Sequence, residues 1–82
     1  MKINQLAKNQ FTWVDETTGE KVFQSYNSII VKISKEGKVT LGRHWNYSVN
    51  TGKYRNLFLG ETKKETQAKI DSGEYVVDEN LL

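Results

Sequence analysis

The chain has 82 residues, a net charge of +2 and no cysteine, so neither a disulfide nor a thiolate zinc site can stabilise its fold. This length predicts a single domain, residues 1–82, with a thin core and marginal stability. The longest apolar runs, 29–31 and 57–59, are far shorter than the ~20 residues of a membrane span. The first ten residues lack the apolar segment of a secretion signal. We therefore expect a cytosolic protein without membrane contact.

Charge is distributed unevenly along the chain. Residues 1–27 contain three lysines and three acidic residues, whereas residues 28–55 contain six cations and a single acid, Glu36. Residues 56–82 contain three lysines and six acidic residues. Two interpretations stay open: a solvated surface whose basic and acidic parts attract each other, or a basic middle that faces an anionic partner.

The first predicted elements lie before residue 27. Residues 1–9 are polar with Ile3 and Leu6 three positions apart, which indicates a helical turn or a loosely docked, flexible arm. Residues 10–26 are typical of a β-hairpin, with alternating side chains on the first arm and turn-forming residues around Gly19. The second arm has apolar side chains on both faces, which predicts a central strand.

Residues 28–42 give the clearest hairpin of the chain. Gly37 occupies the turn, where a positive φ angle is favourable. The apolar face carries Ile29, Val31, Ile33, Val39 and Leu41. Ile30 breaks the alternation, so we expect a helix or a partner to cover part of the other face.

Residues 45–60 hold one of the two tryptophans and two of the four tyrosines, and they fit two structures. In a helix, Ser48 is the N-cap and Gly60 ends the last turn. The apolar stripe of that helix consists of Tyr54, Leu57 and Phe58. In a hairpin, residues 50–52 form the turn between Tyr47 and Tyr54. The helix is favoured, because its caps and stripe outweigh the cost of about 1 kcal/mol for Gly52 relative to alanine.

Residues 62–72 predict a second helix. Thr62 and Glu65 have the spacing of a capping box, and Gly73 is a natural stop. Its one strong apolar residue, Ile70, is helped by Ala68, which places this helix on the surface.

Residues 74–77 predict a short final strand, and residues 78–82 a tail that frays. The element order is then β-β-β-β-α-α-β. This order predicts an α+β domain, a four- to five-stranded antiparallel sheet with two short helices packed on one face. A small SH3-like barrel with a helical insertion is the alternative.

No pattern of catalytic or metal-binding residues occurs. His44 is the single histidine, with no second imidazole or thiol to share a metal. The carboxylates lack calcium-loop spacing, and the six glycines match no phosphate-binding loop. We therefore expect no enzyme activity, no catalytic residue, no metal and no cofactor.

The candidate binding residues combine aromatic rings with cations. They are Arg43, His44, Trp45, Tyr47, Lys53, Tyr54 and Arg55. If Lys53 and Arg55 straddle Tyr54, they could hold an anion while the ring stacks on a base. The alternative is that the rings of Trp45, Tyr54 and Phe58 belong to the core and the cations are solvated. Tyr47 and Arg55 are the residues expected outside the core.

A DNA-binding interpretation of the two helices is disfavoured. The second helix has Lys63, Lys64 and Lys69, but Glu65 and Asp71 offset them and arginine is absent. Phosphate-driven affinity needs several uncompensated cations.

Four strings carry a resemblance to known proteins: FQSYNSII (23–30), WNYS (45–48), KYRNLFLGET (53–62) and KIDSGEY (69–75). The chain resembles, over residues 23–80, a group of small uncharacterised proteins encoded by phages and mobile elements of Gram-positive bacteria. The resemblance implies an accessory protein in a bacterial cytosol that inhibits host defence by binding, either to a nuclease such as a CRISPR effector or to a nucleotide signal. It transfers no functional residue.

The sequence therefore favours a non-enzymatic phage or mobile-element accessory protein that acts on a host protein, as a monomer or a homo-oligomer. The second hypothesis is a sponge that sequesters an anionic nucleotide at Tyr47, Lys53 and Arg55. The third is weak nucleic-acid binding by the basic middle.

Overall fold

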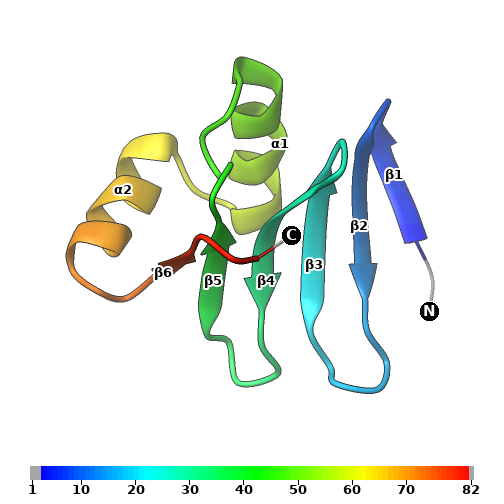
Figure 1. Ribbon diagram of the computed structural model, residues 1–82, viewed down its shortest axis with the longest axis horizontal. Coiled ribbons are helices and arrows are strands. Elements are labelled where there is room, and N and C mark those ends of the chain that lie inside the picture. Colours follow the sequence, from blue (N-terminus) through cyan, green and yellow to red (C-terminus); the bar gives the residue numbers. More distant parts are fainter. Residues whose placement is uncertain (1–2, 82) are drawn as a thin grey trace.

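The computed structural model describes residues 3–81, which form one six-stranded sheet and two helices (Figure 1). The strands lie in the sheet in the order in which they occur along the chain, from β1 at one edge to β6 at the other. The elements are β1 (Ile3–Ala7), β2 (Gln10–Val14), β3 (Lys21–Ser25), β4 (Ser28–Ile33), β5 (Val39–Gly42), α1 (Val49–Leu59), α2 (Lys63–Asp71) and β6 (Val76–Asp78). The α+β class is as predicted.

The sheet is larger than expected and it is mixed. Strands β1 to β5 pair antiparallel, whereas β5 and β6 pair in parallel. Parallel neighbours cannot be joined by a tight turn, and here α1 and α2 provide the crossover between them. The prediction of four to five antiparallel strands is corrected on both points. The barrel alternative is wrong, because the sheet is open with edges at β1 and β6.

Residues 3–7 form an edge strand, so the helical turn or loose arm expected for residues 1–9 is wrong over this range. Ile3 pairs with Trp13 across the β1–β2 ladder. The register shifts between Gln5 and Ala7, and this irregularity explains why the apolar side chains are three positions apart. Met1 and Lys2 lie outside the described residues.

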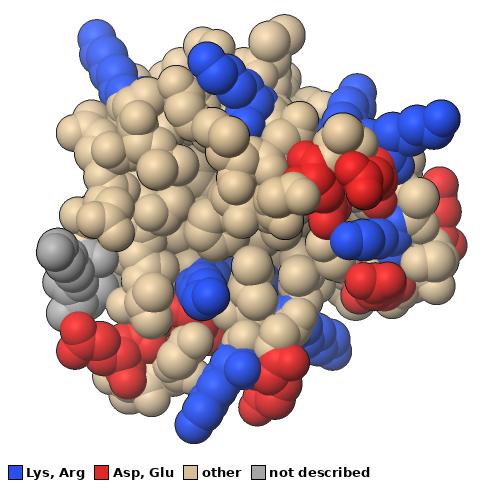
Figure 2. Space-filling model, turned by 180° about the vertical axis from the view of Figure 1, so that it is seen from behind, with Lys and Arg blue, Asp and Glu red and all other residues tan. Residues whose placement is uncertain are grey.

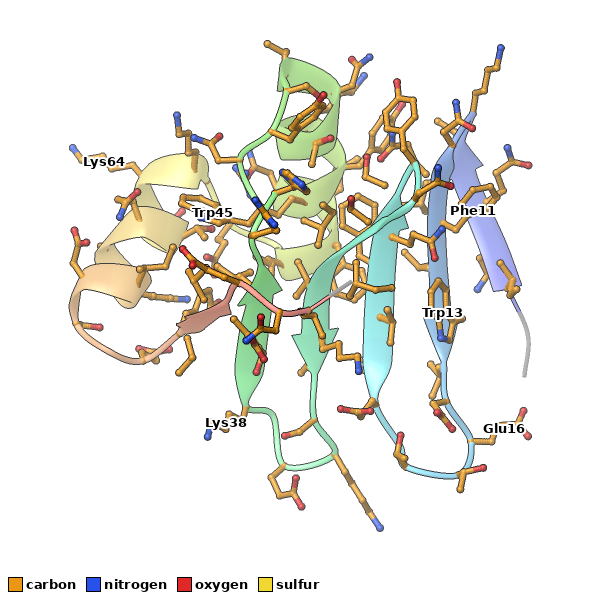
Figure 3. The ribbon with its side chains drawn as sticks, in the orientation of Figure 1. Phe11, Trp13, Glu16, Lys38, Trp45 and Lys64 are labelled. Carbon is orange, nitrogen blue, oxygen red and sulfur yellow. The ribbon has the colours of Figure 1, made fainter. Side chains whose placement is uncertain are left out.

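The β2–β3 hairpin is confirmed, and β3 is a central strand as predicted. Phe23 and Val22 are both buried but point to opposite faces of the sheet. Phe23 stacks on Phe58 of α1 with ring centroids 5.8 Å apart, so its face is the helix-covered one. Trp13 pairs with Val22, and it lies with Phe11 on the face without a helix (Figure 3).

A bulge in β4 explains the broken alternation in that strand. Val31 pairs with Phe23 and Ile29 with Gln24, so Ile30 is the extra residue. Ile30 and Val31 are both buried as a result. The expectation that a helix or a partner covers the other face at Ile30 is wrong, because the bulge brings Ile30 into the same core cluster as Phe23 and Val31. The core consists of Phe23, Ile30, Val31, Val39, Leu41 and Tyr75.

Helix α1 is confirmed, and the hairpin alternative for this segment is wrong. The Ser48 hydroxyl accepts a hydrogen bond from the Thr51 N–H at 3.2 Å, and Gly60 ends the helix with a left-handed φ of 70°. Of the predicted stripe, Tyr54 and Phe58 pack against the core, whereas Leu57 is 66% exposed. The fully buried residues of the helix are instead Thr51, Gly52 and Arg55.

Helix α2 and the last strand complete the crossover. The predicted capping box is present, with Thr62 and Glu65 each bonded to the other's backbone N–H. Ile70 packs against the core, as expected for a narrow contact stripe. β6 begins two residues later than predicted, and the buried Tyr75 precedes it. Leu82, at the end of the tail expected to fray, lies outside the described residues.

Within residues 3–81, neither helix has the length or the apolar character to cross a membrane.

Candidate functional site

An open groove of about 750 Å³ lies between the β3–β4 turn and the N-terminal end of α1. Its volume is within the range of ligand-binding clefts in proteins. The lining residues come from residues 25–30 and 44–51: Ser25, Tyr26, Asn27, Ser28, Ile30, His44, Tyr47, Ser48, Val49, Asn50 and Thr51. None of them is a lysine, arginine, aspartate or glutamate, so the groove is lined by neutral polar groups, aromatic rings and two aliphatic side chains.

A chain of hydroxyl groups connects the two sides of the groove. The Ser48 hydroxyl donates to Thr51 Oγ1 at 3.1 Å, and Thr51 Oγ1 lies 2.9 Å from the Ser25 hydroxyl. Ser25 ends β3, whereas Ser48 and Thr51 belong to the first turn of α1. Ser25 and Thr51 are buried, where an unmade hydrogen bond is expensive. These hydrogen bonds therefore hold the start of α1 against β3.

Tyr26 forms one side of the groove from a left-handed backbone conformation, with φ of 54°. Few residues other than glycine adopt this conformation. Its N–H donates to the Asn9 carbonyl, and its carbonyl accepts from Gln24 Nε2, each at 2.7 Å. These two bonds hold a tight turn whose tyrosine side chain is 49% exposed.

Tyr47 and Val49 form the opposite side. Tyr47 is 70% exposed, and its ring meets the edge of the His44 ring with centroids 5.3 Å apart. Val49, the first residue of α1, is 88% exposed. Together with Tyr26, these two side chains place three exposed large apolar groups around one groove, which is typical of a binding surface.

Arg55 is buried, with 1% of its surface exposed, so the expectation that it lies outside the core is wrong. Its Nη1 donates to the Trp45 carbonyl at 2.6 Å, and its Nη2 donates to Asn56 Oδ1 at 2.9 Å. The guanidinium carbon lies 5.2 Å from the centre of the Trp45 ring. Burial lowers the pKa of Arg55, an effect that the nearby Glu61 opposes. Arg55 thus anchors the loop that leads to Tyr47.

The predicted binding residues are divided among three environments. His44 and Tyr47 line the groove. Trp45 and Tyr54 are partly buried and pack against the core, with Trp45 beside α1 (Figure 3). Arg43 and Lys53 are exposed. The Lys53 ammonium lies 5.4 Å from the centre of the Tyr54 ring, but neither residue lines the groove. The expected arrangement of two cations that straddle Tyr54 over a ligand is not assembled.

Sequence reasoning missed Tyr26, Asn27 and Val49. A tyrosine and an asparagine between two strands indicate a tight turn, and asparagine tolerates turn conformations well. This pattern predicts a loop tip but not that the tip faces residues 44–51. The contact between these segments depends on the packing of α1 against β3, which no local pattern shows.

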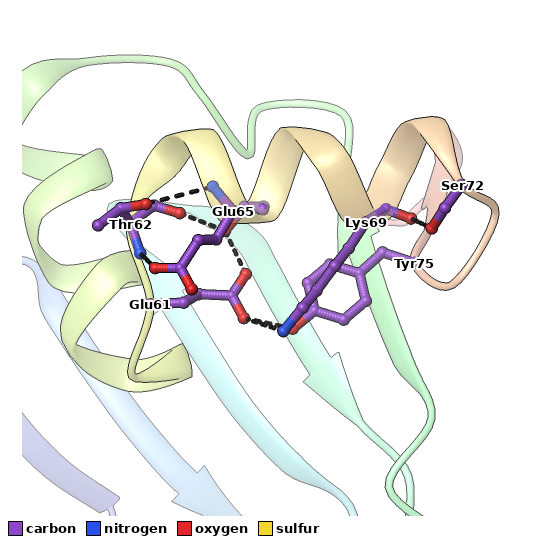
Figure 4. Close-up of polar contacts among 7 residues, drawn as sticks. Glu61, Thr62, Glu65, Lys69, Ser72 and Tyr75 are labelled. Atoms are coloured by element: carbon purple, nitrogen blue, oxygen red, sulfur yellow. Dashed lines mark hydrogen bonds and ion pairs between the residues drawn. The ribbon is translucent and has the colours of Figure 1, made fainter.

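A second polar cluster joins the end of α1 to α2 and to the residue before β6 (Figure 4). The Glu61 carboxylate accepts hydrogen bonds from Lys69 Nζ at 2.8 Å, the Tyr75 hydroxyl at 2.7 Å and the Thr66 hydroxyl at 2.5 Å. Burial raises the pKa of Glu61, but the bonds from Lys69, Thr66 and Tyr75 outweigh it and lower the pKa below the usual value. Burial and the bond to Glu61 raise the pKa of Tyr75. Because the carboxylate is saturated with internal donors, we assign this cluster to stability.

Within residues 3–81, no three His, Cys, Asp or Glu side chains lie close enough together to hold a metal ion.

A family described as a family of unknown function (DUF8033) matches residues 1–74. The chain belongs to this family. The DUF8033 match includes residues 1–22, which the resemblance to phage-encoded proteins leaves out, and it contains every residue of the groove. No curated protein and no solved structure is significantly similar to the chain.

Proposed function

We propose that the chain is a non-enzymatic binding protein and that the groove is the centre of its contact with a partner protein. The observation that carries this proposal is the exposure of Tyr26, Tyr47 and Val49 around one uncharged hollow. Tyrosine is enriched in the energetically dominant part of protein interfaces, because its large ring loses little conformational entropy on binding. The exposure of these three side chains does not stabilise the fold itself.

The distribution of charge supports this choice of surface. Figure 2 shows the helix-covered face, where charged side chains gather mainly along the margin and over α2. A broad uncharged area remains between them. Interface centres are depleted in charged residues, whereas their rims are polar. The groove and the area around it have this composition.

The proposed partner is a host defence protein. The resemblance to small proteins of phages and mobile elements supports an accessory role in a bacterial cytosol, and such proteins often act by inhibiting host defence. We propose that a nuclease such as a CRISPR effector is the kind of partner bound. This step rests on the resemblance, whereas the choice of surface rests on the groove.

Partner capture from a bacterial lysate, combined with a defence assay, tests the proposal. Immobilised wild-type chain is compared with the double variant Tyr26→Ala/Tyr47→Ala and with Leu57→Ala, which removes an exposed apolar side chain outside the groove. We expect a host protein to bind the wild type and Leu57→Ala but not the double variant. Expression of the same two chains should suppress plasmid interference by that host. Equal capture by all three chains would contradict the choice of surface, and no captured protein with intact host defence would contradict the function.

Sequestration of an anionic nucleotide is the competing function. Tyr47 is exposed in the groove, but Arg55 is buried and Lys53 lies outside the groove. A ligand on Tyr47 would therefore lack the cations that a phosphate group needs. Thermal-shift measurement against a panel of nucleotides separates the functions, because a ligand at 100 times its Kd adds about 2.7 kcal/mol of stability. A flat response is expected, and a clear shift that is lost in Tyr47→Ala would favour the nucleotide.

A further inference from the structure

We infer that the groove takes a short, extended, uncharged peptide segment of the partner, which inserts one apolar side chain between Tyr26 and Tyr47. This inference rests on the proposed function and specifies what the groove recognises. It follows from the charge of the lining, from the free polar groups at the rim, from the apolar centre and from the rigidity of the two sides.

The charge of the lining sets the charge of the ligand. None of the lining side chains is acidic or basic apart from His44. An acidic or phosphorylated segment would lose its hydration here without gaining a lysine or an arginine, and a basic segment would gain no carboxylate. The segment that complements this groove is therefore neutral along the part that enters it.

The rim offers neutral hydrogen-bonding groups that have no internal partner. Within residues 3–81, the side chains of Asn27, Ser28 and Asn50 make no hydrogen bond. Asn27 and Ser28 lie on the β3–β4 side, and Asn50 lies on the α1 side. Amide and hydroxyl groups can both donate and accept. An extended peptide presents alternating N–H and carbonyl groups, all of which need partners when water is excluded.

The centre of the groove is apolar. Ile30 lines it from below with almost no exposed surface, and Tyr26 and Tyr47 lie on its two sides. An aliphatic or aromatic side chain placed between the two rings would remove apolar surface of both tyrosines from water. One anchor of this kind supplies affinity in peptide recognition, while the backbone contacts fix the orientation of the segment.

Both sides of the groove are held in place before a ligand arrives. The hydroxyl chain from Ser25 through Thr51 to Ser48 connects them, and two backbone bonds hold the turn of Tyr26. Arg55 anchors the loop that precedes Tyr47. A preorganised site loses little conformational entropy on binding, so a short segment suffices for measurable affinity.

Selection from a display library of random linear peptides tests the inference. We expect enriched peptides to share an uncharged stretch around one aromatic or large aliphatic residue. A synthetic copy of the best peptide should shift the backbone amide signals of Tyr26, Tyr47 and Asn50 in NMR spectra. Its Kd should rise about tenfold or more in Tyr47→Ala, as for an interface hot spot, and stay unchanged in Leu57→Ala.

A second variant separates an effect on binding from an effect on folding. Asn50→Asp changes one exposed atom of the rim and introduces a charge, and circular dichroism checks that the fold is retained. This variant should also weaken the uncharged peptide. Weakening by Asn50→Asp with an unchanged spectrum supports the inference, and unchanged affinity overturns it.

Other outcomes overturn the inference while leaving the proposed function intact. These are enrichment of charged peptides, absence of any enriched peptide, amide shifts outside the groove, or groove shifts produced by a panel of neutral saccharides instead. If capture of a host protein still depends on Tyr26 and Tyr47, the partner binds as a folded surface and the function stands. If capture is also independent of these residues, the groove is not the contact surface, so this inference and the proposed choice of surface both fail.

Discussion

Arg55 shows how a single residue can change its role once the chain is folded. A guanidinium close in sequence to two tyrosines suits an anion, yet here it lies under the loop that it anchors and forms no ion pair with a carboxylate of residues 3–81. Its Nε has no partner within the described residues. A buried cation without a close countercharge contributes specificity of geometry more than stability.

Replacement of Arg55 tests this role. Arg55→Lys keeps a charge that must still be buried, and a lysine cannot donate to Trp45 and Asn56 with the same planar geometry. We expect a loss of about 1–3 kcal/mol in the free energy of unfolding. Arg55→Met removes the charge and keeps much of the packing volume. It should therefore lower the free energy of unfolding by no more than Arg55→Lys does. Urea denaturation measures both, and a lysine variant as stable as wild type would contradict this assignment.

Glu61 makes stability depend on pH. Its pKa is lower in the folded chain than the ordinary value of about 4.3, because three donors surround the ionised carboxylate. A lowered pKa contributes stability that is fully present above the ordinary value and is lost as pH falls through the folded value. Below about pH 4, the Glu61 cluster should therefore weaken.

Thermal unfolding of wild type and Glu61→Gln at several pH values measures this contribution. At pH 7 the variant should be less stable by about 1 kcal/mol, because it loses a partly buried, charge-assisted hydrogen bond with Lys69. The difference should shrink as the pH falls below 4 and wild type becomes protonated. A difference that stays constant down to pH 3 would show that the charge of Glu61 is irrelevant.

The two helices have equivalent N-caps in different surroundings. Ser48 caps α1 and also connects through Thr51 to β3, whereas Thr62 caps α2 on an exposed surface. Replacement of an N-cap by alanine typically costs about 0.5–2 kcal/mol. The two caps therefore form a matched pair that separates helix stability from groove geometry.

We expect Ser48→Ala and Thr62→Ala to lower the free energy of unfolding by similar amounts, about 1 kcal/mol each. Only Ser48→Ala should weaken binding at the groove, because Ser48 lines the groove and bonds to the Thr51 hydroxyl that contacts Ser25 of β3, whereas Thr62 lies outside the groove. Chemical denaturation measures the first quantity, and capture of the partner measures the second. Equal loss of binding in both variants would indicate that stability alone controls it.

The junction between β5 and the groove loop requires a glycine. A Cβ atom at Gly42 would overlap the backbone carbonyl oxygen of Ile29, so backbone must move to accept it. At Gly60 a Cβ would meet no atom, and only the positive φ is unfavourable. Gly42→Ala should therefore cost clearly more than Gly60→Ala, which should cost about 1–2 kcal/mol. Equal costs in urea denaturation would contradict the close approach of β4 and β5.

Across the whole molecule, the basic middle of the chain does not form one surface. Lys32 lies on the helix-free face of the sheet, since it pairs with Val22 and Thr40. Lys53 lies on α1, at the other face, and Arg55 is buried. Lys35 and Lys38 belong to the turn between β4 and β5. Cations dispersed in this way neutralise few phosphates of one nucleic acid at a time.

We therefore expect no measurable binding to single-stranded or duplex DNA at about 150 mM salt, and at most weak binding at about 50 mM. Fluorescence anisotropy across a salt series measures this binding. A complex that persists at the higher salt and is lost when Lys35 and Lys38 are replaced by glutamate would restore the nucleic-acid hypothesis.

Local patterns by themselves determined much of the architecture. The strand alternation of residues 10–42, the glycine turns and the caps at Ser48, Thr62 and Gly60 involve residues close in sequence, and these elements lie where the sequence predicts them. The tertiary structure decided which face of α1 is buried, because Thr51 bonds to Ser25 of β3 and Arg55 donates to the Trp45 carbonyl, both outside the helix. It also decided the bulge at Ile30 and the placement of Tyr26 and Tyr47 around one groove. Contacts between segments some twenty residues apart depend on packing, and packing energies are not encoded in the spacing of side chains along one element.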